Sequence, residues 1–345
     1  MPIDQSLADV SNTFFLWTIV AYTVAMSCYA IEYAFGTRGA VAAAARSSAA
    51  PVRQRELVGV APGGPATTPT PPEPPDELET AAPGLRSDAN RVLGGIAVAA
   101  TFLGFALALT SLVTRGVSVG RVPWGNMYEF VCLACLVGVL CWLIVIIRRP
   151  QLRHLGLFVL LPVVLLLGLA GTVLYAEAAP LVPALNSVWL KIHVSAAATS
   201  SGIFLFGFVC AVLYLLRQGY DARIAEGRVV KFPFTLAPRL PVAESLERLT
   251  FRVHALAFPL WTFAVIAGAI WAEAAWTRYW GWDPKETWAF ISWVVYAAYL
   301  HARATAGWWG KRATFIVVLG WATMMVNLFV INLVQTGLHS YAGVN

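Results

Sequence analysis

Long apolar runs separated by shorter polar segments make up most of this chain. Eight runs lie near 12–35, 92–113, 127–147, 155–175, 188–216, 250–272, 287–303 and 313–334. A helix needs about 20 apolar residues to cross about 30 Å of hydrocarbon. The run 287–303 is short, so we expect its helix to begin inside the tryptophan-rich segment before it. The pattern predicts an all-α polytopic membrane protein with about eight transmembrane helices.

One long polar segment interrupts the pattern. After a first transmembrane helix within 1–35, residues 36–90 are rich in Pro, Ala and Arg and include the run PGGPATTPTPPEPPDELETAAPG. A segment with this density of Pro, Thr, Gly and acidic residues cannot bury an apolar core, so we predict a disordered linker. The remaining residues, 91–345, then form one membrane domain.

Composition and the placement of basic residues predict the membrane topology. Hydrophobic residues make up 59% of the chain and charged residues 12%, whereas soluble domains carry about 25% charged residues. With the N-terminus outside, 19 of the 24 Lys and Arg fall on the inner side and 5 outside. Cytoplasmic segments carry the excess of basic residues. We therefore expect both termini and the segment 271–288 to be extracytoplasmic, and the linker to be cytoplasmic.

The segment 271–288, WAEAAWTRYWGWDPKETW, places five tryptophans in one connection: Trp271, Trp276, Trp280, Trp282 and Trp288. Tryptophan favours membrane interfaces, so an aromatic belt without a ligand is one interpretation. A belt, however, places one or two rings at each helix end. The higher density here favours a flat aromatic platform for a large planar ligand.

Two histidines fall at the depth of this segment. His193 lies in the first turns of the fifth run, and His339 follows the last run in TGLHSYAG. Imidazole is a good iron ligand, and two imidazoles on opposite faces of a planar macrocycle would form a six-coordinate haem. For each histidine alone, a hydrogen bond to water or a carbonyl is the alternative. Their shared depth beside the tryptophans favours a pair of iron ligands.

Two further histidines, His254 and His301, lie at the inner ends of the sixth and seventh runs, where ionisable groups are functional candidates. His301 follows Glu286 by 15 residues, about 22 Å along a continuous helix. It is a candidate for a separate ligand station on the cytoplasmic side. The alternative is a histidine that extends to the interface beside Arg303. We expect His154, in a basic inner loop, to be structural.

The sequence Asp283-Pro284-Lys285-Glu286 is typical of a helix start, with Asp at the N-cap, Pro at the first helical position and Glu at the third. We expect Asp283 and Glu286 first of all to cap the seventh helix. The cap would also set the angle at which the neighbouring tryptophans are presented. Arg278 and Lys285 are candidates to pair with anionic groups such as haem propionates, with simple solvation as the alternative.

The third run contains Cys132-x-x-Cys135, a spacing that some redox proteins use. This pair lies inside an apolar helix, with no second pair and no polar neighbours, so we expect small buried core residues. The preceding sequence PWGNMYEF (123–130) places Asn126, Tyr128 and Glu129 at an outer helix start, where they line the site or cap that helix.

The sequence WAEAAWTRYWGWDPKETWA resembles the WWD signature of the CcsA/ResC family, named CcsB in some bacteria, the haem-handling membrane subunit of system II cytochrome c biogenesis. The form WDPKETW is specific to this branch, and the related haem handlers CcmC and CcmF carry looser versions. The resemblance runs from about residue 92 to the C-terminus and includes PWGNMYEF, LKIHVSAA, YLHAR and LHSYAG.

The resemblance implies which residues contact haem b, held transiently as substrate or cofactor. Two external histidines of the family ligate the iron and match His193 and His339 by order and side. A membrane histidine implicated in passing haem across the bilayer matches His301, whereas His254 matches no family ligand. The expected haem contacts are His193, His339, His301, Trp271, Trp276, Trp280, Trp282, Asp283, Trp288, Arg278 and Lys285. No acid–base catalytic residue is expected.

The resemblance also implies a function in cytochrome c maturation. Haem would be delivered for thioether attachment to the CxxCH motif of apocytochrome c, by a component of a holocytochrome c synthase (haem lyase). The expected partners are a CcsB/ResB-type membrane subunit, apocytochrome c and a thioredoxin-like thiol reductant, with no nucleic acid. The expected location is the cell inner (plasma) membrane, with the active site on the extracytoplasmic side.

Three other functions remain open. One is a haem exporter whose external site is only a release point. Another is a membrane thiol–disulfide carrier that uses Cys132 and Cys135. The third is an electron-transfer subunit with a permanent haem.

Overall fold

The computed structural model describes residues 3–35, 83–181, 186–305, 307–335 and 337–338. All regular elements in these ranges are helical, which confirms the predicted all-α class. In chain order they are α1 (Gln5–Phe35), α3 (Pro83–Ser118), α4 (Met127–Arg148), η2 (Pro150–Leu155), α5 (Gly156–Thr172), α6 (Val188–Ala225), η4 (Phe234–Arg239), α7 (Ala243–Trp276), α8 (Pro284–Ala304), α9 (Lys311–Met325), η5 (Val326–Val330) and α10 (Ile331–Val334).

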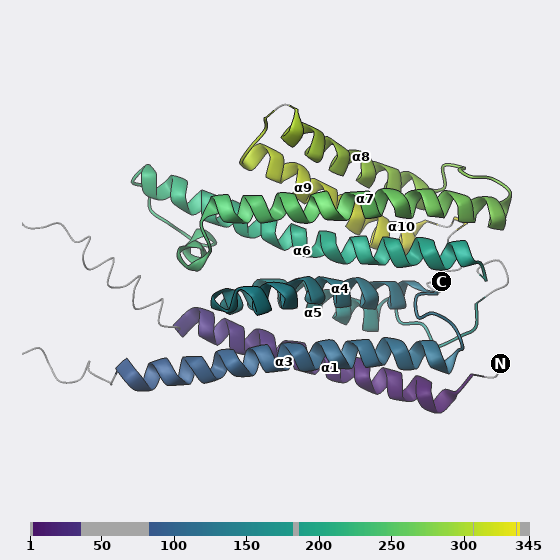
Figure 1. Ribbon diagram of the computed structural model, residues 1–345, viewed down its shortest axis with the longest axis horizontal. Helices are drawn as coiled ribbons and strands as arrows, with labels where there is room; N and C mark the ends of the chain where they lie inside the picture. Colours follow the sequence, from purple (N-terminus) through teal and green to yellow (C-terminus); the bar gives the residue numbers. More distant parts are fainter. Residues whose placement is uncertain (1–2, 36–82, 182–185, 306, 336, 339–345) are drawn as a thin grey trace, which may run out of the picture.

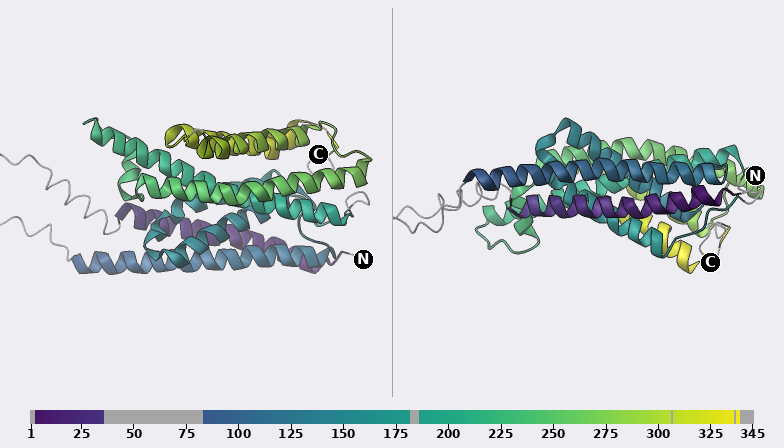
Figure 2. Two further views of the ribbon diagram at one scale, coloured as in Figure 1. Left: turned by 45° about the horizontal axis from the view of Figure 1, so that its top comes forward. Right: turned by 90° about the horizontal axis from the view of Figure 1, so that it is seen from below.

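The helices run side by side as an elongated bundle (Figure 1). The α1–α3 pair covers one side, α4 to α7 form the middle, and α8 and α9 cover the opposite side (Figure 2). The start of α1, the end of α3, the start of α6 and the α7–α8 connection lie at one end of the bundle. We call this the outer end, because the basic-residue count predicts it to be extracytoplasmic.

Seven helical segments in the described ranges are long and apolar enough to cross a membrane, so the protein is a multi-pass membrane protein. The remaining expected span, 287–303, corresponds to α8, which has 21 residues, about 32 Å at 1.5 Å per residue. It is not among the seven, so a total of eight stays a prediction. Its start at Pro284 confirms that this helix begins inside the tryptophan-rich segment.

The boundary of the expected linker differs from the prediction. Most of 36–90 lies outside the described residues, but α3 already begins at Pro83. Proline suits the first position of a helix, because its φ is compatible and its missing N–H has no partner to lose there. The last residues assigned to a disordered linker are therefore helical.

Hydroxyl groups join α1 to α3 where both helices are apolar. Ser11 Oγ donates to the Ser111 carbonyl at 2.8 Å, and Ser111 Oγ donates to the Ser11 carbonyl at 2.9 Å. Tyr29 and Thr101 pair through their hydroxyls at 3.2 Å. Small polar residues allow helix backbones to approach closely in a membrane, and the reciprocal bonds satisfy groups that hydrocarbon cannot.

Candidate functional site

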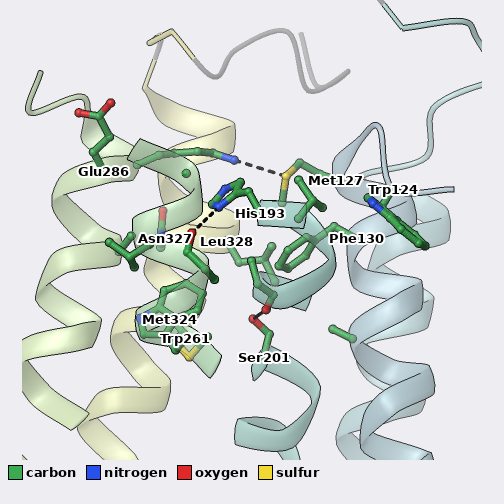
Figure 3. Close-up of a pocket in the computed structure, with 18 of the residues that line it drawn as sticks. Trp124, Met127, Phe130, His193, Ser201, Trp261, Glu286, Met324, Asn327 and Leu328 are labelled. Atoms are coloured by element: carbon green, nitrogen blue, oxygen red, sulfur yellow. Dashed lines mark hydrogen bonds between the residues drawn. The ribbon is translucent and has the colours of Figure 1, made fainter. Parts of the chain in front are cut away.

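A cavity of about 210 Å³ lies at the outer end, between α4, α6, α7, α8 and the α9–η5 helix (Figure 3). Its wall includes α6 residues from Leu190 to Leu205, a stretch of about 22 Å at helical rise. The lining is largely apolar and includes eight Trp, Tyr and Phe side chains: Trp124, Phe130, Trp261, Trp271, Trp276, Tyr279, Trp280 and Trp321. The site is thus a deep apolar cavity that extends from the tryptophan-rich segment into the bundle.

His193 projects into this cavity from the second turn of α6. Its Nδ1 lies 2.8 Å from the carbonyl oxygen of Ala264 on α7, so the ring N–H donates to that carbonyl. With Nδ1 engaged in this way, Nε2 is the nitrogen suited to bind a metal. The imidazole also lies nearly parallel to the Trp271 ring, at 11° and 6.2 Å between centroids. The structure therefore places His193 beside the tryptophans, as predicted.

Gly268 on α7 makes room for the His193 ring. A Cβ at this position would lie 2.7 Å from both Nδ1 and Cε1 of the imidazole, closer than real Cβ contacts allow. Because α7 presents the Ala264 carbonyl one turn earlier, the helix supplies both the space and the acceptor for the ring. Ala264 acts through its backbone carbonyl and Gly268 through its lack of a side chain, so neither residue could be singled out from the sequence.

The five tryptophans separate into two groups. Trp271, Trp276 and Trp280 line the cavity, whereas Trp282 is 67% exposed and, like Trp288, is not among the lining residues. Trp271 and Trp276 meet at 63°, and Trp280 and Trp282 at 89°. The expectation of one flat platform is therefore wrong. Edge-to-face contact suits the ring quadrupole, and the first two rings belong to α7 while the others follow its end.

The connection between α7 and α8 is short and held from both sides. Thr277 ends α7 in the left-handed region with φ 56°, and Trp282 has φ 57°. Asp283 and Glu286 form a capping box at the start of α8, which confirms their predicted capping role. Arg278 lies 3.7 Å from Glu286 and packs over Gly281, so its guanidinium interacts within the connection and is not among the cavity-lining groups.

Within the part of the chain that the structure describes, Lys285 is the one Lys or Arg on the cavity wall. Its Nζ donates to Met127 Sδ at 3.3 Å across the cavity's outer part (Figure 3). A thioether is a weak acceptor, so the ammonium is poorly satisfied by this contact. Lys285 thus fits the predicted pairing with an anionic group better than Arg278 does.

Deeper in the cavity the wall carries polar atoms that sequence reasoning missed. Asn327 belongs to the π-helical segment η5, and Trp261 lies on α7. Among the described residues, Asn327 Oδ1 and Trp261 Nε1 are buried without a hydrogen-bond partner. Buried polar groups are nearly always satisfied, so these atoms are suited to meet a ligand or water. π-helical segments also occur frequently at functional sites.

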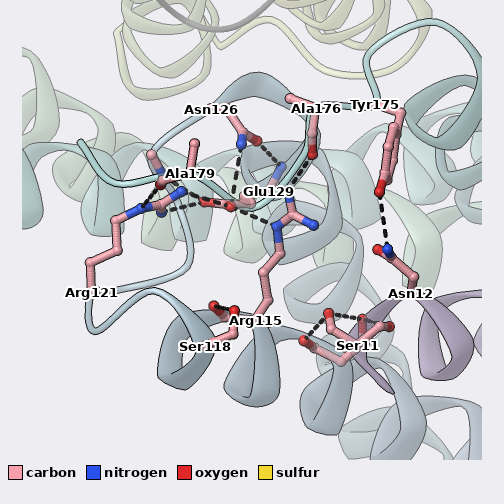
Figure 4. A network of polar contacts seen from close by, with 12 residues as sticks. Ser11, Asn12, Arg115, Ser118, Arg121, Asn126, Glu129, Tyr175, Ala176 and Ala179 are labelled. Atoms are coloured by element: carbon pink, nitrogen blue, oxygen red, sulfur yellow. Dashed lines mark hydrogen bonds and ion pairs between the residues drawn. The ribbon is translucent and has the colours of Figure 1, made fainter. Parts of the chain in front are cut away.

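A buried charge cluster, shown in Figure 4, lies next to the cavity-lining residues Gly125 and Asn126. Glu129 accepts from Arg115 and from Arg121, each at 2.7 Å, and its side chain is fully buried. It also accepts from the backbone N–H of Gly125 at 2.7 Å, and its own N–H donates to Asn126 Oδ1 at 2.9 Å. The expected helix cap at Asn126 is confirmed, and the two arginines are partners that the motif alone did not indicate.

This cluster connects elements distant in sequence. Arg115 comes from the end of α3 and also donates to the Ala176 carbonyl, while Arg121 donates to the Ala179 carbonyl. The cluster therefore ties α3, α4 and the segment after α5 together beside the lining residue Met127. Two cations against one carboxylate leave it with excess positive charge.

The other predicted histidines lie elsewhere. His301 is exposed near the inner end of α8, and because α8 is continuous, the expected separation from Glu286 holds. His254 is fully buried beside Phe204 and Tyr296, with Nδ1 2.7 Å from the Thr250 carbonyl. His154 packs on Tyr33 near the inner end, consistent with a structural role. His339 lies outside the described residues.

Cys132 and Cys135 are free thiols within α4, with exposures of 7% and 1%. Cys135 touches the cavity wall, and Cys132 packs toward α1 and α3. Both are part of the apolar core, as predicted.

Comparison with known proteins identifies the family. A family profile described as "Cytochrome C assembly protein" matches residues 124–339, which include the whole tryptophan-rich segment. This chain belongs to that family. The matched region begins at the cavity-lining Trp124, so α1 and α3 lie outside it.

Curated relatives named "Cytochrome c biogenesis protein CcsA" agree with this assignment. The protein of Guillardia theta is 36% identical over 246 residues, covering 68% of this chain and 81% of the relative. That of Porphyra purpurea is 34% identical over 268 residues, with 68% and 83% covered. That of Synechocystis is 32% identical over 283 residues, with 68% and 84% covered.

A solved structure has a similar fold. It is the chain described as "Cytochrome c Heme Lyase CcmF", with a TM-score of 0.54 at 16% sequence identity. The superposition covers 95% of this chain and 47% of that chain, so this chain spans about half of its length. At this identity the likeness concerns the fold.

Replacing Glu129 with alanine is predicted to destabilise the protein strongly. The change would leave two buried guanidinium groups without their carboxylate, which typically costs about 3–5 kcal/mol. Thermal unfolding of the detergent-purified protein measures the effect. The control is Glu244→Ala, because Glu244 pairs with Arg248 at 3.0 Å while 74% exposed, and such pairs contribute at most about 1 kcal/mol. Equal shifts in the two variants would contradict the importance assigned to the cluster.

The two core thiols are predicted to resist alkylation in the folded protein. Because Cys132 and Cys135 are almost completely covered, N-ethylmaleimide should modify them only after denaturation in SDS, as mass spectrometry of peptides can show. A Cys132→Ala/Cys135→Ala variant should keep supporting cytochrome c maturation in cells. Rapid labelling of both thiols in the native protein, or loss of maturation in that variant, would support a thiol–disulfide carrier instead.

Proposed function

We propose that this protein binds haem in the cavity at its outer end and, with a second membrane subunit, delivers it for covalent attachment to apocytochrome c. The observation that carries the proposal is His193, held by the Ala264 carbonyl and the Trp271 ring on the wall of a deep aromatic cavity. The family to which the chain belongs supports cytochrome c as the final acceptor.

The residues of the cavity suit haem as a substrate. The apolar and aromatic lining matches a porphyrin ring, and an imidazole whose Nδ1 is already engaged is a typical haem ligand through Nε2. Lys285, satisfied only weakly by Met127, is placed to pair with a propionate. His339 is the second axial ligand in this proposal, while Trp282 and Trp288 are left to contact what enters from outside.

The chemistry requires positioning more than acid–base catalysis. Each thiol S–H of the apocytochrome motif adds across a vinyl C=C, forming one C–S bond and one C–H bond without an external oxidant. The thiols must be reduced before this addition, and a thioredoxin-like reductant would carry out that step. The contribution of this chain is to hold the vinyl groups at fixed positions beside the incoming peptide.

His301 is assigned to the arrival of haem from the cytoplasmic side. Its imidazole is exposed near the inner end of α8, about 22 Å from the capping box at helical rise. A second subunit of the CcsB/ResB type would supply the opposing ligand, since an exposed imidazole on a helix surface faces whatever packs there. In this proposal α8 connects an inner and an outer haem station.

Absorption spectra of the detergent-purified protein test the ligand assignment. Wild type from haem-replete cells should show a six-coordinate low-spin haem. His193→Ala and His339→Ala should each weaken this spectrum, and added imidazole should restore it. Protein without haem, or a spectrum indifferent to both substitutions, would overturn the proposed site.

Co-expression tests the reaction. The wild-type chain, its partner subunit and an apocytochrome should together yield haem that remains bound to the cytochrome after denaturation. Transfer of haem across the membrane without any covalent product would favour the exporter, and haem that never leaves the chain would favour an electron-transfer subunit.

The close approach of Gly268 to His193 generates a further prediction. Gly268→Ala should displace the imidazole and lower haem affinity by about 10- to 100-fold, as loss of a supporting group around a metal ligand does. Haemin titration followed by absorption measures it. Gly95→Ala is the matched control, because a Cβ there meets nothing within 4 Å. Identical affinities for the two variants would show that the ring position is not critical.

A further inference from the structure

Asp283 contacts two different parts of the chain through its two carboxylate oxygens. Oδ2 accepts from the backbone N–H of Lys285 at 3.2 Å, which is the capping contact at the start of α8. Oδ1 accepts from the backbone N–H of Leu338 at 2.9 Å, a residue 55 positions further along the chain. The carboxylate is buried, with the residue 7% exposed.

The approach of the C-terminal segment to this carboxylate is close. A Cβ on Gly337 would lie 2.6 Å from Asp283 Oδ1. The residue before the hydrogen-bonded N–H therefore has to be small for the segment to reach the carboxylate. The hydrogen bond and the close approach together show that residues 337–338 pack directly against the Asp283 carboxylate.

Asp283 is itself held in place by Glu286. Glu286 Oε2 accepts from the backbone N–H groups of Gly281 at 2.8 Å and Asp283 at 3.1 Å. The backbone that carries the carboxylate is thus fixed at the first turn of α8. A hydrogen bond to a charged, buried acceptor is roughly twice as strong as one between neutral groups.

We propose that Asp283 is a positioning residue for His339: its carboxylate binds the backbone N–H of Leu338 and so fixes the chain at the residue immediately before this proposed ligand. This inference rests on the proposed function, in which His339 is an axial ligand. It replaces the expectation that Asp283 contacts haem, because Asp283 is not among the cavity-lining residues. Capping of α8 and seating of the segment are then two roles of one carboxylate.

Asp283→Asn tests the proposal with little change of volume. The amide keeps one acceptor and replaces the other with an N–H₂ group, so the cap and the Leu338 contact can no longer both be satisfied. In haemin titrations of the full-length protein, we expect at least about tenfold weaker binding and partial conversion from a six-coordinate to a five-coordinate spectrum. Added imidazole should restore the six-coordinate form.

Double variants show whether the effect passes through His339. Asp283→Asn combined with His339→Ala should be no worse than His339→Ala alone, whereas combined with His193→Ala it should add to that loss, since coupled residues are non-additive. Gly337→Ala, which leaves Asp283 intact, should reproduce the spectrum of Asp283→Asn. Ser187→Ala removes the N-cap of α6, the helix that carries His193, and serves as the control for loss of a cap alone.

The outcomes separate this inference from the proposed function. A wild-type protein without histidine-ligated haem would overturn both. If wild type has the six-coordinate spectrum and Asp283→Asn keeps it, or loses haem without rescue by imidazole, the positioning role is wrong while the site stands. The role is also wrong if Ser187→Ala gives the same five-coordinate, imidazole-rescued spectrum.

Discussion

The hydrogen bond from His193 to the Ala264 carbonyl is the contact on which the arrangement of the cavity depends. It joins α6 to α7 at the outer end, where an unsatisfied ring N–H would otherwise face apolar side chains. The contact requires the absence of a side chain at Gly268, because the His193 ring of α6 lies directly against the α7 backbone there. Because α7 continues directly into Trp271 and Trp276, fixing this one ring also fixes the aromatic wall beside it.

Carboxylates hold the rest of the outer end in the same way. Glu129 accepts hydrogen bonds from two arginines, from the Gly125 N–H and from the Asn126 side-chain amide at the start of α4. Glu286 and Asp283 accept from backbone N–H groups of the α7–α8 connection and the first turn of α8. Each carboxylate is buried and each has several donors, which is the condition under which a buried charge is tolerated. The apolar cavity is therefore bordered by polar clusters in which each carboxylate is held by several donors from the protein itself.

Sequence patterns predicted the elements well, because each depends on neighbours in the chain. Apolar runs located the helices, and the DPKE segment located the start of α8 and its capping box. The depth of His193 followed from its distance along the fifth run. The prediction that the linker extends through residues 83–90 was wrong, because composition characterises a whole segment and does not locate the residue at which a helix begins.

What could not be predicted depends on contacts between distant helices. The partners of Glu129 come from α3 and the α3–α4 connection, and Met127 meets Lys285 across the cavity. The flat platform failed for the same reason: ring density is visible in the sequence, but the angle between Trp271 and Trp276 depends on packing. Gly268 and Gly337 were overlooked because their importance lies in what approaches them.

The two ends of α8 are fixed by similar chemistry, and this bears on how the proposed inner and outer haem stations can be connected. At the outer end the capping box and the Asp283–Leu338 contact hold its first turn. At the inner end Arg303 donates to Glu247 at 2.6 Å, and Glu247 also accepts from the Gly310 N–H at 2.8 Å. A helix held at both ends resists sliding along its axis. Under the proposed function, movement of haem between the two stations is therefore better explained by passage along the surface of α8 than by a shift of α8 that carries His301 outward.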